Sequence, residues 1–261
     1  MRGPEHVTVD AEGRILTGTE DGHIWRLTLP YARRGLLRVD PRSRTVRTLA
    51  DEVNGTPLRF RSNVTTAADG TVYFTVSSRR YALENWLGHI LEHRGTDNCC
   101  GSSPAAVRKC CATGCSSPTE VALAPDESFV AVAESGDRRI SRHWLTGPRT
   151  GKRDTLVNDL PGYPDNLTRG TDGVFWVALA GPREPAVSWL HHAATAVRRA
   201  AWATIKNLKP RPRPTVRVLA VRPDGRIVRH LLRHRSPYAC TPETKDVNFH
   251  GTTDPALKRL G

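Results

Sequence analysis

The sequence lacks a long apolar run: no window approaches the ~18 consecutive apolar residues that a membrane-spanning helix needs. Hydrophobic residues make up 38% of the 261 positions, which limits the size of the core. A β pattern begins at Val7, so the first residues leave no room for a signal peptide. We therefore expect a cytoplasmic protein whose N-terminus is incomplete.

Acidic residues are also scarce, and the formal net charge is +13. A strongly basic chain can indicate a nucleic-acid partner. Here, however, the cations are mostly scattered arginines, with only a local cluster at 206–213. The distribution predicts no nucleic-acid partner.

Cysteine is unevenly distributed, because five of the six residues lie between 99 and 115. The stretch 97–119 has neither a two-residue nor a 3.6-residue period, so we expect it to be irregular, with unligated and unpaired cysteines. A zinc knuckle is one alternative, but no CxxC spacing is present. A shifted reading frame is the other: suitable GC-rich codons, read two nucleotides on, encode GQLLRLVPGGGAEVLRDGLQFPNG, a strand, turn, strand and loop.

A turn followed by an apolar run recurs five times along the chain. The turns centre on residues 13, 70, 127, 173 and 225, so the intervals are 57, 57, 46 and 52 residues. Further strand pairs fall between copies, at 35–40 with 45–49 and at 139–144 with 154–157. This spacing predicts a β-propeller in a single domain over 1–261, while a β-sandwich is the alternative.

Two segments depart from the propeller repeat. Between 29 and 35 about half a blade is missing relative to a ~40–50-residue repeat, which predicts a shortened first blade. Residues 183–214 form a helical, Pro-rich insertion, with Val187, Leu190, Val197 and Ile205 on one stripe of a helix near 187–208. That basic helix either packs on the domain, which we favour, or lies on a membrane surface.

Motifs spread over nearly the whole chain resemble the strictosidine synthase-like family, within the senescence-marker-protein/gluconolactonase superfamily of six-bladed propellers. They include Gly-Pro-Glu at 3–5, Asp-Gly-His-Ile at 21–24, Leu-Arg-Phe at 58–60 with Asn63, Ala-Pro-Asp-Glu-Ser at 124–128, Trp-Leu-Thr-Gly-Pro at 144–148 and Leu-Pro-Gly-Tyr-Pro-Asp-Asn at 160–166. The resemblance implies an all-β, six-bladed propeller, with one blade disrupted at 97–119.

The resemblance also implies a metal site of hard oxygen ligands, most commonly for Ca²⁺. Carried over by position, Glu5, Asn63 and Asp165 are the ligands. A further family Asn has no counterpart at 117–120, and Val76 replaces a usual Asp. We therefore expect weak or lost ion binding. Asp165 is also the candidate catalytic residue, although a turn-capping role is the alternative.

The function implied is metal-assisted hydrolysis of small esters or lactones, with a small-molecule substrate. A non-enzymatic or inactive propeller, the product of a degraded gene, is the alternative. Strictosidine synthase-type condensation of an amine with an aldehyde is disfavoured, because Glu243 alone offers a carboxylate at 238–251 and its context does not match.

Overall fold

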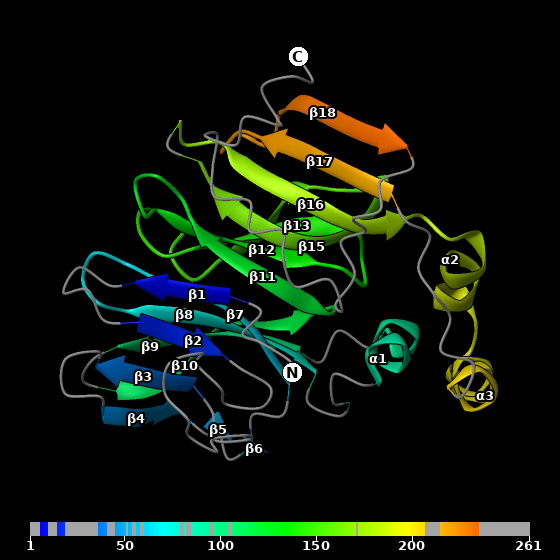
Figure 1. Ribbon diagram of the computed structural model, residues 1–261, viewed down its shortest axis with the longest axis horizontal. Helices are drawn as coiled ribbons and strands as arrows, with labels where there is room; N and C mark the ends of the chain where they lie inside the picture. Colours follow the sequence, from blue (N-terminus) through cyan, green and yellow to red (C-terminus); the bar gives the residue numbers. More distant parts are fainter. Residues whose placement is uncertain are drawn as a thin grey trace. The chain divides into compact units, whose positions relative to one another are not determined.

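A computed structural model describes residues 6–9, 15–18, 36–40, 45–50, 52–53, 56–57, 60–78, 81, 85–93, 97–103, 106–170, 172–206 and 215–234. These residues form antiparallel sheets with few helices (Figure 1). The chain divides into two compact units, residues 1–121 and 122–261, and the division falls inside strand β11.

The first unit holds two four-stranded sheets. One has the order β1-β2-β3-β4 and the other β10-β9-β8-β7, and β5 and β6 form a separate two-stranded ribbon. Val64, Val72, Phe74 and Val76 are buried on β7 and β8, and Leu91 is buried in the short helix α1. The elements are β1 (His6–Val9), β2 (Ile15–Gly18), β3 (Leu36–Asp40), β4 (Thr45–Ala50), β5 (Glu52–Val53), β6 (Thr56–Pro57), β7 (Phe60–Thr66), β8 (Val72–Ser78), α1 (Trp86–Glu92), β9 (Asp97–Ser103) and β10 (Ala106–Cys115).

The second unit is built on the sheets β11-β12-β13-β14 and β15-β16-β17-β18. Helices α2 and α3 are inserted between β16 and β17. The elements are β11 (Pro118–Leu123), β12 (Phe129–Glu134), β13 (Arg139–Trp144), β14 (Arg153–Val157), β15 (Gly162–Arg169), β16 (Phe175–Pro182), α2 (Pro185–His192), α3 (Thr195–Ile205), β17 (Thr215–Val221) and β18 (Ile227–His234).

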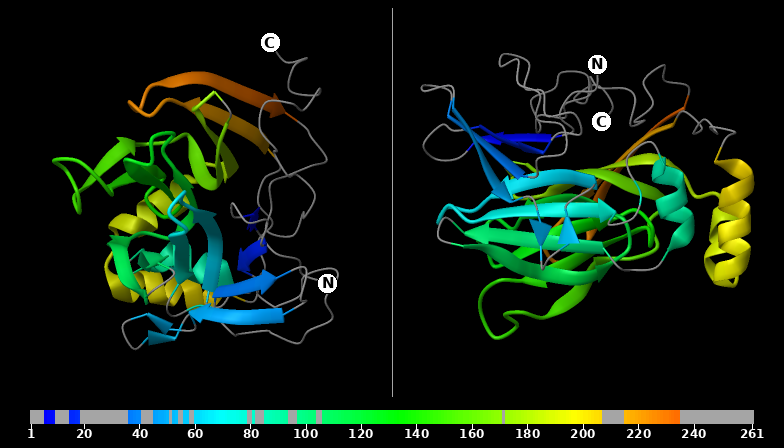
Figure 2. Two further views of the ribbon diagram at one scale, coloured as in Figure 1. Left: turned by 90° about the vertical axis from the view of Figure 1, so that its left-hand side faces the viewer. Right: turned by 90° about the horizontal axis from the view of Figure 1, so that it is seen from below.

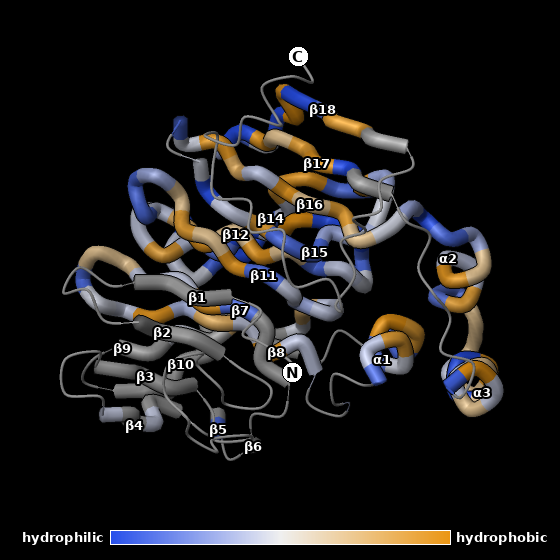
Figure 3. Tube along the Cα trace, in the orientation of Figure 1, coloured by the Kyte–Doolittle hydropathy of each residue, from blue (hydrophilic) through white to orange (hydrophobic). Residues whose placement is uncertain are grey.

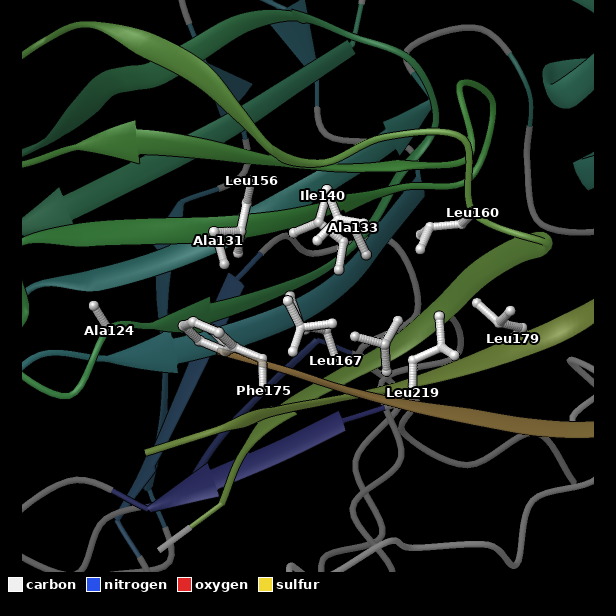
Figure 4. Close-up of a cluster of buried hydrophobic side chains, with 14 of the residues drawn as sticks. Ala124, Ala131, Ala133, Ile140, Leu156, Leu160, Leu167, Phe175, Leu179 and Leu219 are labelled. Atoms are coloured by element: carbon white, nitrogen blue, oxygen red, sulfur yellow. The ribbon is translucent and has the colours of Figure 1, made fainter. Parts of the chain in front are cut away.

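An apolar cluster joins the two sheets of the second unit. Ile140, Leu167, Phe175 and Leu219 are almost fully buried in it, and Figure 4 shows their side chains converging. Phe129 lies 6.0 Å from Phe175, centroid to centroid. The apolar runs that mark β12 and β16 in the sequence therefore supply this core, since burying them from water is the main favourable term.

The predicted turns share one geometry in each described copy. An aspartate carboxylate accepts a hydrogen bond from the backbone N–H two residues on, which stabilises the turn without help from the core. The contacts are Asp69 with Thr71 (2.8 Å), Asp126 with Ser128 (3.1 Å), Asp172 with Val174 (3.1 Å) and Asp224 with Arg226 (2.9 Å). The predicted strand pairs β3–β4 and β13–β14 also form.

The prediction of an irregular segment at 97–119 is wrong. Residues 97–103 and 106–115 are strands β9 and β10, and β9 pairs with β8. Three register shifts interrupt the β9–β10 pairing. Strand pairing is made by backbone groups, so a sheet can recruit a segment without side-chain periodicity. Cys99 and Cys115 are buried thiols that form no disulfide in the described part of the chain.

The described residues form four four-stranded sheets, whereas the superfamily resemblance implies six blades. The turns at 172–173 and 224–225, expected to begin separate blades, connect β15 to β16 and β17 to β18 of one sheet. Near the N-terminus β3 pairs directly with β2, so the short connection expected to truncate the first blade still yields four strands. The strand expected at 24–27 lies outside the described residues.

The helical insertion lies within one sheet and is broken in two. Ala193 and Ala194 have extended backbone (ψ 159° and 149°), which separates α2 from α3 and interrupts the single stripe expected over 187–208. In Figures 1 and 2 both helices lie beyond the end of β16, away from the faces of the β15–β18 sheet. Neither helix contains a fully buried residue, although several side chains of both helices are partly buried.

Candidate functional site

The predicted ligand positions that the structure describes lie in equivalent strands of three of the large sheets. Each sheet has its first strand, β1, β7, β11 or β15, at one edge. Asn63 lies in β7 and Asp165 in β15, and the family loop at 117–120 leads into β11. Glu5 lies outside the described residues, one position before β1 in the sequence. Asn63, Asp165 and residues 118–120 of the family loop therefore lie in the first strand of their sheets, while Asn63 and Asp165 belong to different units.

Asn63 is buried without satisfying its side chain. Its relative exposure is 2%, and neither its amide oxygen nor its amide nitrogen has a hydrogen-bond partner in the described part of the chain. A register shift between Arg61 and Val64 places Asn63 in a bulge of β7, a distortion that commonly redirects a side chain. An unsatisfied buried amide costs about 1–3 kcal/mol, so this side chain is poised for a ligand.

The backbone around Asn63 is, in contrast, well supported. The Asn63 N–H donates to the Thr75 hydroxyl oxygen (3.1 Å), and that hydroxyl donates to the Thr119 carbonyl (3.2 Å). The neighbouring Ser77 hydroxyl donates to the Pro118 carbonyl (2.6 Å). Alternate hydroxyls of β8 thus fix the start of β11 and leave the Asn63 amide as the unsatisfied group.

Asp165 lies in a second bulge. Pro164 pairs with Leu179 and Asn166 with Ala178, so Asp165 is the extra residue of β15. The predicted loop at 162–166 is thus a bulged strand. Burial, which removes water from the carboxylate, raises the pKa of Asp165 to about 6. The residue as a whole still keeps some accessible surface. Its carboxylate makes no hydrogen bond or ion pair within the described residues, so the turn-capping alternative has no contact to support it.

The fourth predicted position lacks a comparable ligand. In the segment 117–120 the resemblance places the family Asn at Thr119, whose backbone carbonyl already accepts from Thr75. Glu120 and Ser117 are buried there. Val76, in place of a usual Asp, is also buried and adds no oxygen. The described residues therefore contain only part of the family's ligand set.

The sequence motifs did not reveal a second group of buried polar residues, which lies in the second unit. Glu134 is fully buried and accepts from Arg139 (2.9 Å) and from Arg153. The Ser141 hydroxyl and His143 Nε2 are 3.1 Å apart. Burial lowers the pKa of His143 to about 4, and the positive charge of Arg153 acts in the same direction.

This Ser–His pair has the residue types of a nucleophile and its base. Both residues are nearly inaccessible, however, with exposures of 1% and 3%. A substrate has no route to them in this conformation, so we interpret the group as structural. The alternation of polar residues along β13 after an apolar β12 was the available sequence signal.

Comparison with known proteins agrees with the sequence motifs. The model "Strictosidine synthase-like, N-terminal" matches residues 1–27, and the model "Strictosidine synthase" matches residues 62–148. The chain belongs to the strictosidine synthase-like family. The second match spans the cysteine-rich segment, which therefore lies within the family's core region.

Curated relatives of this strictosidine synthase-like chain are longer than it is. The protein strictosidine synthase-like 13 of Arabidopsis thaliana is 33% identical over 153 residues, which is 58% of this chain and 38% of that protein. The adipocyte plasma membrane-associated protein of Rattus norvegicus is 34% identical over 156 residues, or 57% of this chain and 41% of that protein. The chain thus spans less than half the length of these relatives.

Solved structures support the propeller fold of the strictosidine synthase-like chain. A gluconolactonase from Xanthomonas campestris aligns with a TM-score of 0.55 at 15% identity, covering 87% of this chain and 60% of that one. The calcium-binding protein regucalcin from Agrobacterium tumefaciens aligns with a TM-score of 0.51 at 12% identity, covering 86% and 58%. At these identities the likeness concerns the fold alone. Among the described residues no helix has the length and apolarity needed to cross a bilayer.

Proposed function

We propose that this strictosidine synthase-like protein is a metal-assisted hydrolase of small esters or lactones. Asn63, Asp165 and Glu5 are the proposed ligands of a Ca²⁺ ion. The observation that carries the proposal is the buried Asn63 amide with no partner, at a position chosen from the sequence as a ligand. An amide oxygen and a carboxylate are suitable donors for a hard divalent cation.

When bound, such an ion supplies Lewis-acid chemistry, polarising a carbonyl and lowering the pKa of water. The protein's own contribution is proton transfer and positioning. Without the ion, burial raises the pKa of Asp165 to about 6, so the carboxylate is mostly ionised at pH 7 and can accept a proton or bind a cation. It lies in the bulge of β15.

The second candidate function is a non-enzymatic or inactive propeller. Two observations favour it: Thr119 stands where the family has an Asn, and Val76 replaces a usual Asp. Under this second proposal, the chain keeps the propeller fold and binds the ion weakly or not at all. Amine–aldehyde condensation is not proposed, since Glu243 lies outside the described residues and its sequence context does not match.

A calcium titration monitored by thermal unfolding tests the proposal. We expect Ca²⁺ at about 100 times its Kd to stabilise the wild type by about 2.7 kcal/mol. Asn63→Leu and Asp165→Asn should remove this response. Asp224→Asn, which alters an exposed turn carboxylate, is the matched control and should retain it.

The proposed hydrolase activity is tested by measuring the hydrolysis of aryl esters and lactones in the presence of Ca²⁺ or of a chelator. Activity that needs Ca²⁺ and is lost in Asp165→Asn supports the hydrolase. Calcium stabilisation without hydrolysis would favour the binding propeller, and no stabilisation at millimolar Ca²⁺ would sink the metal site. The proposed cytoplasmic location is tested separately by cell fractionation.

A further inference from the structure

We infer that helices α2 and α3 form a docking surface for anionic phospholipid bilayers. The name α2–α3 surface is used here for residues 185–206. This inference concerns where the protein attaches and is independent of the proposed hydrolase function. Three features of the second unit support it: the exposed apolar side chains of these helices, their positive charge, and the hydrogen bonds that connect α2 to the rest of the unit.

The α2–α3 surface exposes apolar side chains that no described part of the chain covers. Neither helix has a buried residue. Trp189 is 65% exposed and Val197 is 42% exposed, and Figure 3 shows both hydrophobic and hydrophilic residues on these helices. Amphipathic helices that lie in a bilayer interface insert their apolar side chains to the level of the headgroups, where tryptophan is enriched.

The charge of this surface has one sign. Residues 185–206 contain Arg198, Arg199 and Lys206 and no aspartate or glutamate. The sequence continues without an acidic residue to Arg222. Anionic lipids give the cytoplasmic leaflet a negative surface potential that attracts such segments, by about a fivefold gain in affinity for each cation near the surface.

Hydrogen bonds connect helix α2 to the segments that precede β13 and follow β16 in the same unit. The Ser188 hydroxyl in α2 accepts from Arg138 (3.2 Å) and Arg183 (3.4 Å). Both arginines also contact Asp159, at 3.0 and 3.3 Å. Asp159 precedes β15, the strand of Asp165. Docking through α2 would therefore fix the orientation of the second unit on the membrane.

A nucleic acid also attracts cations but does not explain the exposed apolar residues. Phosphate contacts require arginine and lysine, whereas insertion into a bilayer uses tryptophan and aliphatic side chains as well. Trp189 and Val197 therefore favour the lipid surface. Binding of an oligonucleotide remains a measurable outcome of the experiment below.

Co-sedimentation with vesicles tests the inference on the full chain. We expect binding to vesicles of phosphatidylcholine with phosphatidylserine, little binding to phosphatidylcholine alone, and weakening by added salt. Arg199→Glu/Lys206→Glu should lower the affinity by more than about tenfold. Trp189→Ala should lower it without any change in charge.

The matched control is Arg226→Glu/Arg229→Glu, in the turn before β18 and on β18, because both arginines are exposed and the change in net charge is the same. This control should retain most of the binding. Equal losses in the two double variants would show attraction by net charge only and would overturn the inference. So would absence of vesicle binding, or α2–α3-dependent binding of a labelled oligonucleotide that exceeds binding to vesicles. Circular dichroism verifies that each variant is folded.

Discussion

At the scale of the residue, Asn63 and Asp165 show that family motifs predict the position of a site residue but not its local geometry or its contacts. Their positions were predicted from the resemblance, and both lie in the first strand of a sheet. That Asn63 has no partner and that Asp165 occupies a bulge could not be predicted, because both depend on strand register. The hydrophobic pattern and the turns set the overall register of a strand pair, but they do not fix where a bulge interrupts it. The Glu134 network was missed although polar residues alternate along β13, because its partners Arg139 and Arg153 lie on two strands that only the fold brings together.

Asp165→Asn should have opposite effects on stability with and without calcium. In the unfolded chain the carboxyl titrates near 3.8, and in the folded protein its pKa is about 6. Between these values the folded state holds more protons, so this group lowers stability as pH rises through the window. At pH 7.5 without Ca²⁺, the variant should be more stable than wild type by at most about 3 kcal/mol.

Denaturant unfolding of both proteins from pH 3.5 to 7.5 measures this difference. The difference should become small near pH 3.5, where the Asp165 carboxyl is mostly protonated in the folded and in the unfolded state. A difference that persists unchanged at low pH would attribute the effect to packing and not to ionisation. Ca²⁺ at about 1,000 times its Kd stabilises a protein that binds it by about 4.1 kcal/mol, so it should reverse the order at pH 7.5, since the variant loses the proposed ligand.

At the scale of the element, turns were predicted well and strands less reliably. The Asp-Gly turns are determined by local chemistry, namely a carboxylate that accepts from the backbone and a glycine with positive φ. Strands β9 and β10 were missed because their composition gives no alternating pattern. The helical insertion was found, but the break at Ala193 was not, since apolar residues continue in register across it.

Gly225 should tolerate substitution less well than Gly147. Both have positive φ, at 92° and 77°, so alanine would strain either by about 1 kcal/mol. At Gly225 an added Cβ would lie 2.3 Å from the Leu156 carbonyl oxygen, whereas at Gly147 nothing lies within 4 Å. The clash should add about 1–3 kcal/mol at Gly225.

Thermal unfolding of Gly225→Ala and Gly147→Ala checks this comparison, with Gly147→Ala as the control for backbone strain alone. The larger loss in Gly225→Ala would confirm that the β17–β18 turn packs closely against the end of β14. Equal losses would mean that the close approach to Leu156 is relieved at little cost.

At the scale of the whole molecule, the propeller class was predicted, whereas the assignment of the described turns to sheets was not. Period and turn chemistry identify a blade-like unit, but two turns of the same type were assigned to separate blades although they belong to one sheet. A four-stranded blade contains two hairpins, one formed by its first two strands and one by its last two. Counting turns in the sequence does not tell which of these two hairpins a turn belongs to. Pairing partners, which decide this, are set by the tertiary fold.

The cysteine-rich segment provides the last prediction. The shifted-frame sequence of 24 residues replaces 97–120 and ends in Pro-Asn-Gly, which puts an asparagine at position 119. If the missing ligand alone weakens ion binding, Thr119→Asn should raise calcium affinity as much as replacing the whole segment. The Thr75 contact should survive, because Thr119 accepts through its backbone.

Isothermal titration measures the calcium affinity of three proteins: the wild type, Thr119→Asn and the chain with residues 97–120 replaced. The comparison separates the contribution of the side chain at position 119 from that of the rest of the segment. A gain from the full replacement alone would show that the bulged β9–β10 pairing, and not the lost side chain, weakens the site. A gain in neither would mean that position 119 does not face the ion. Resequencing the coding region tests the frame itself: an uninterrupted frame would make β9 and β10 a genuine feature of this chain, with β9 held by backbone pairing to β8 and β10 by pairing to β9.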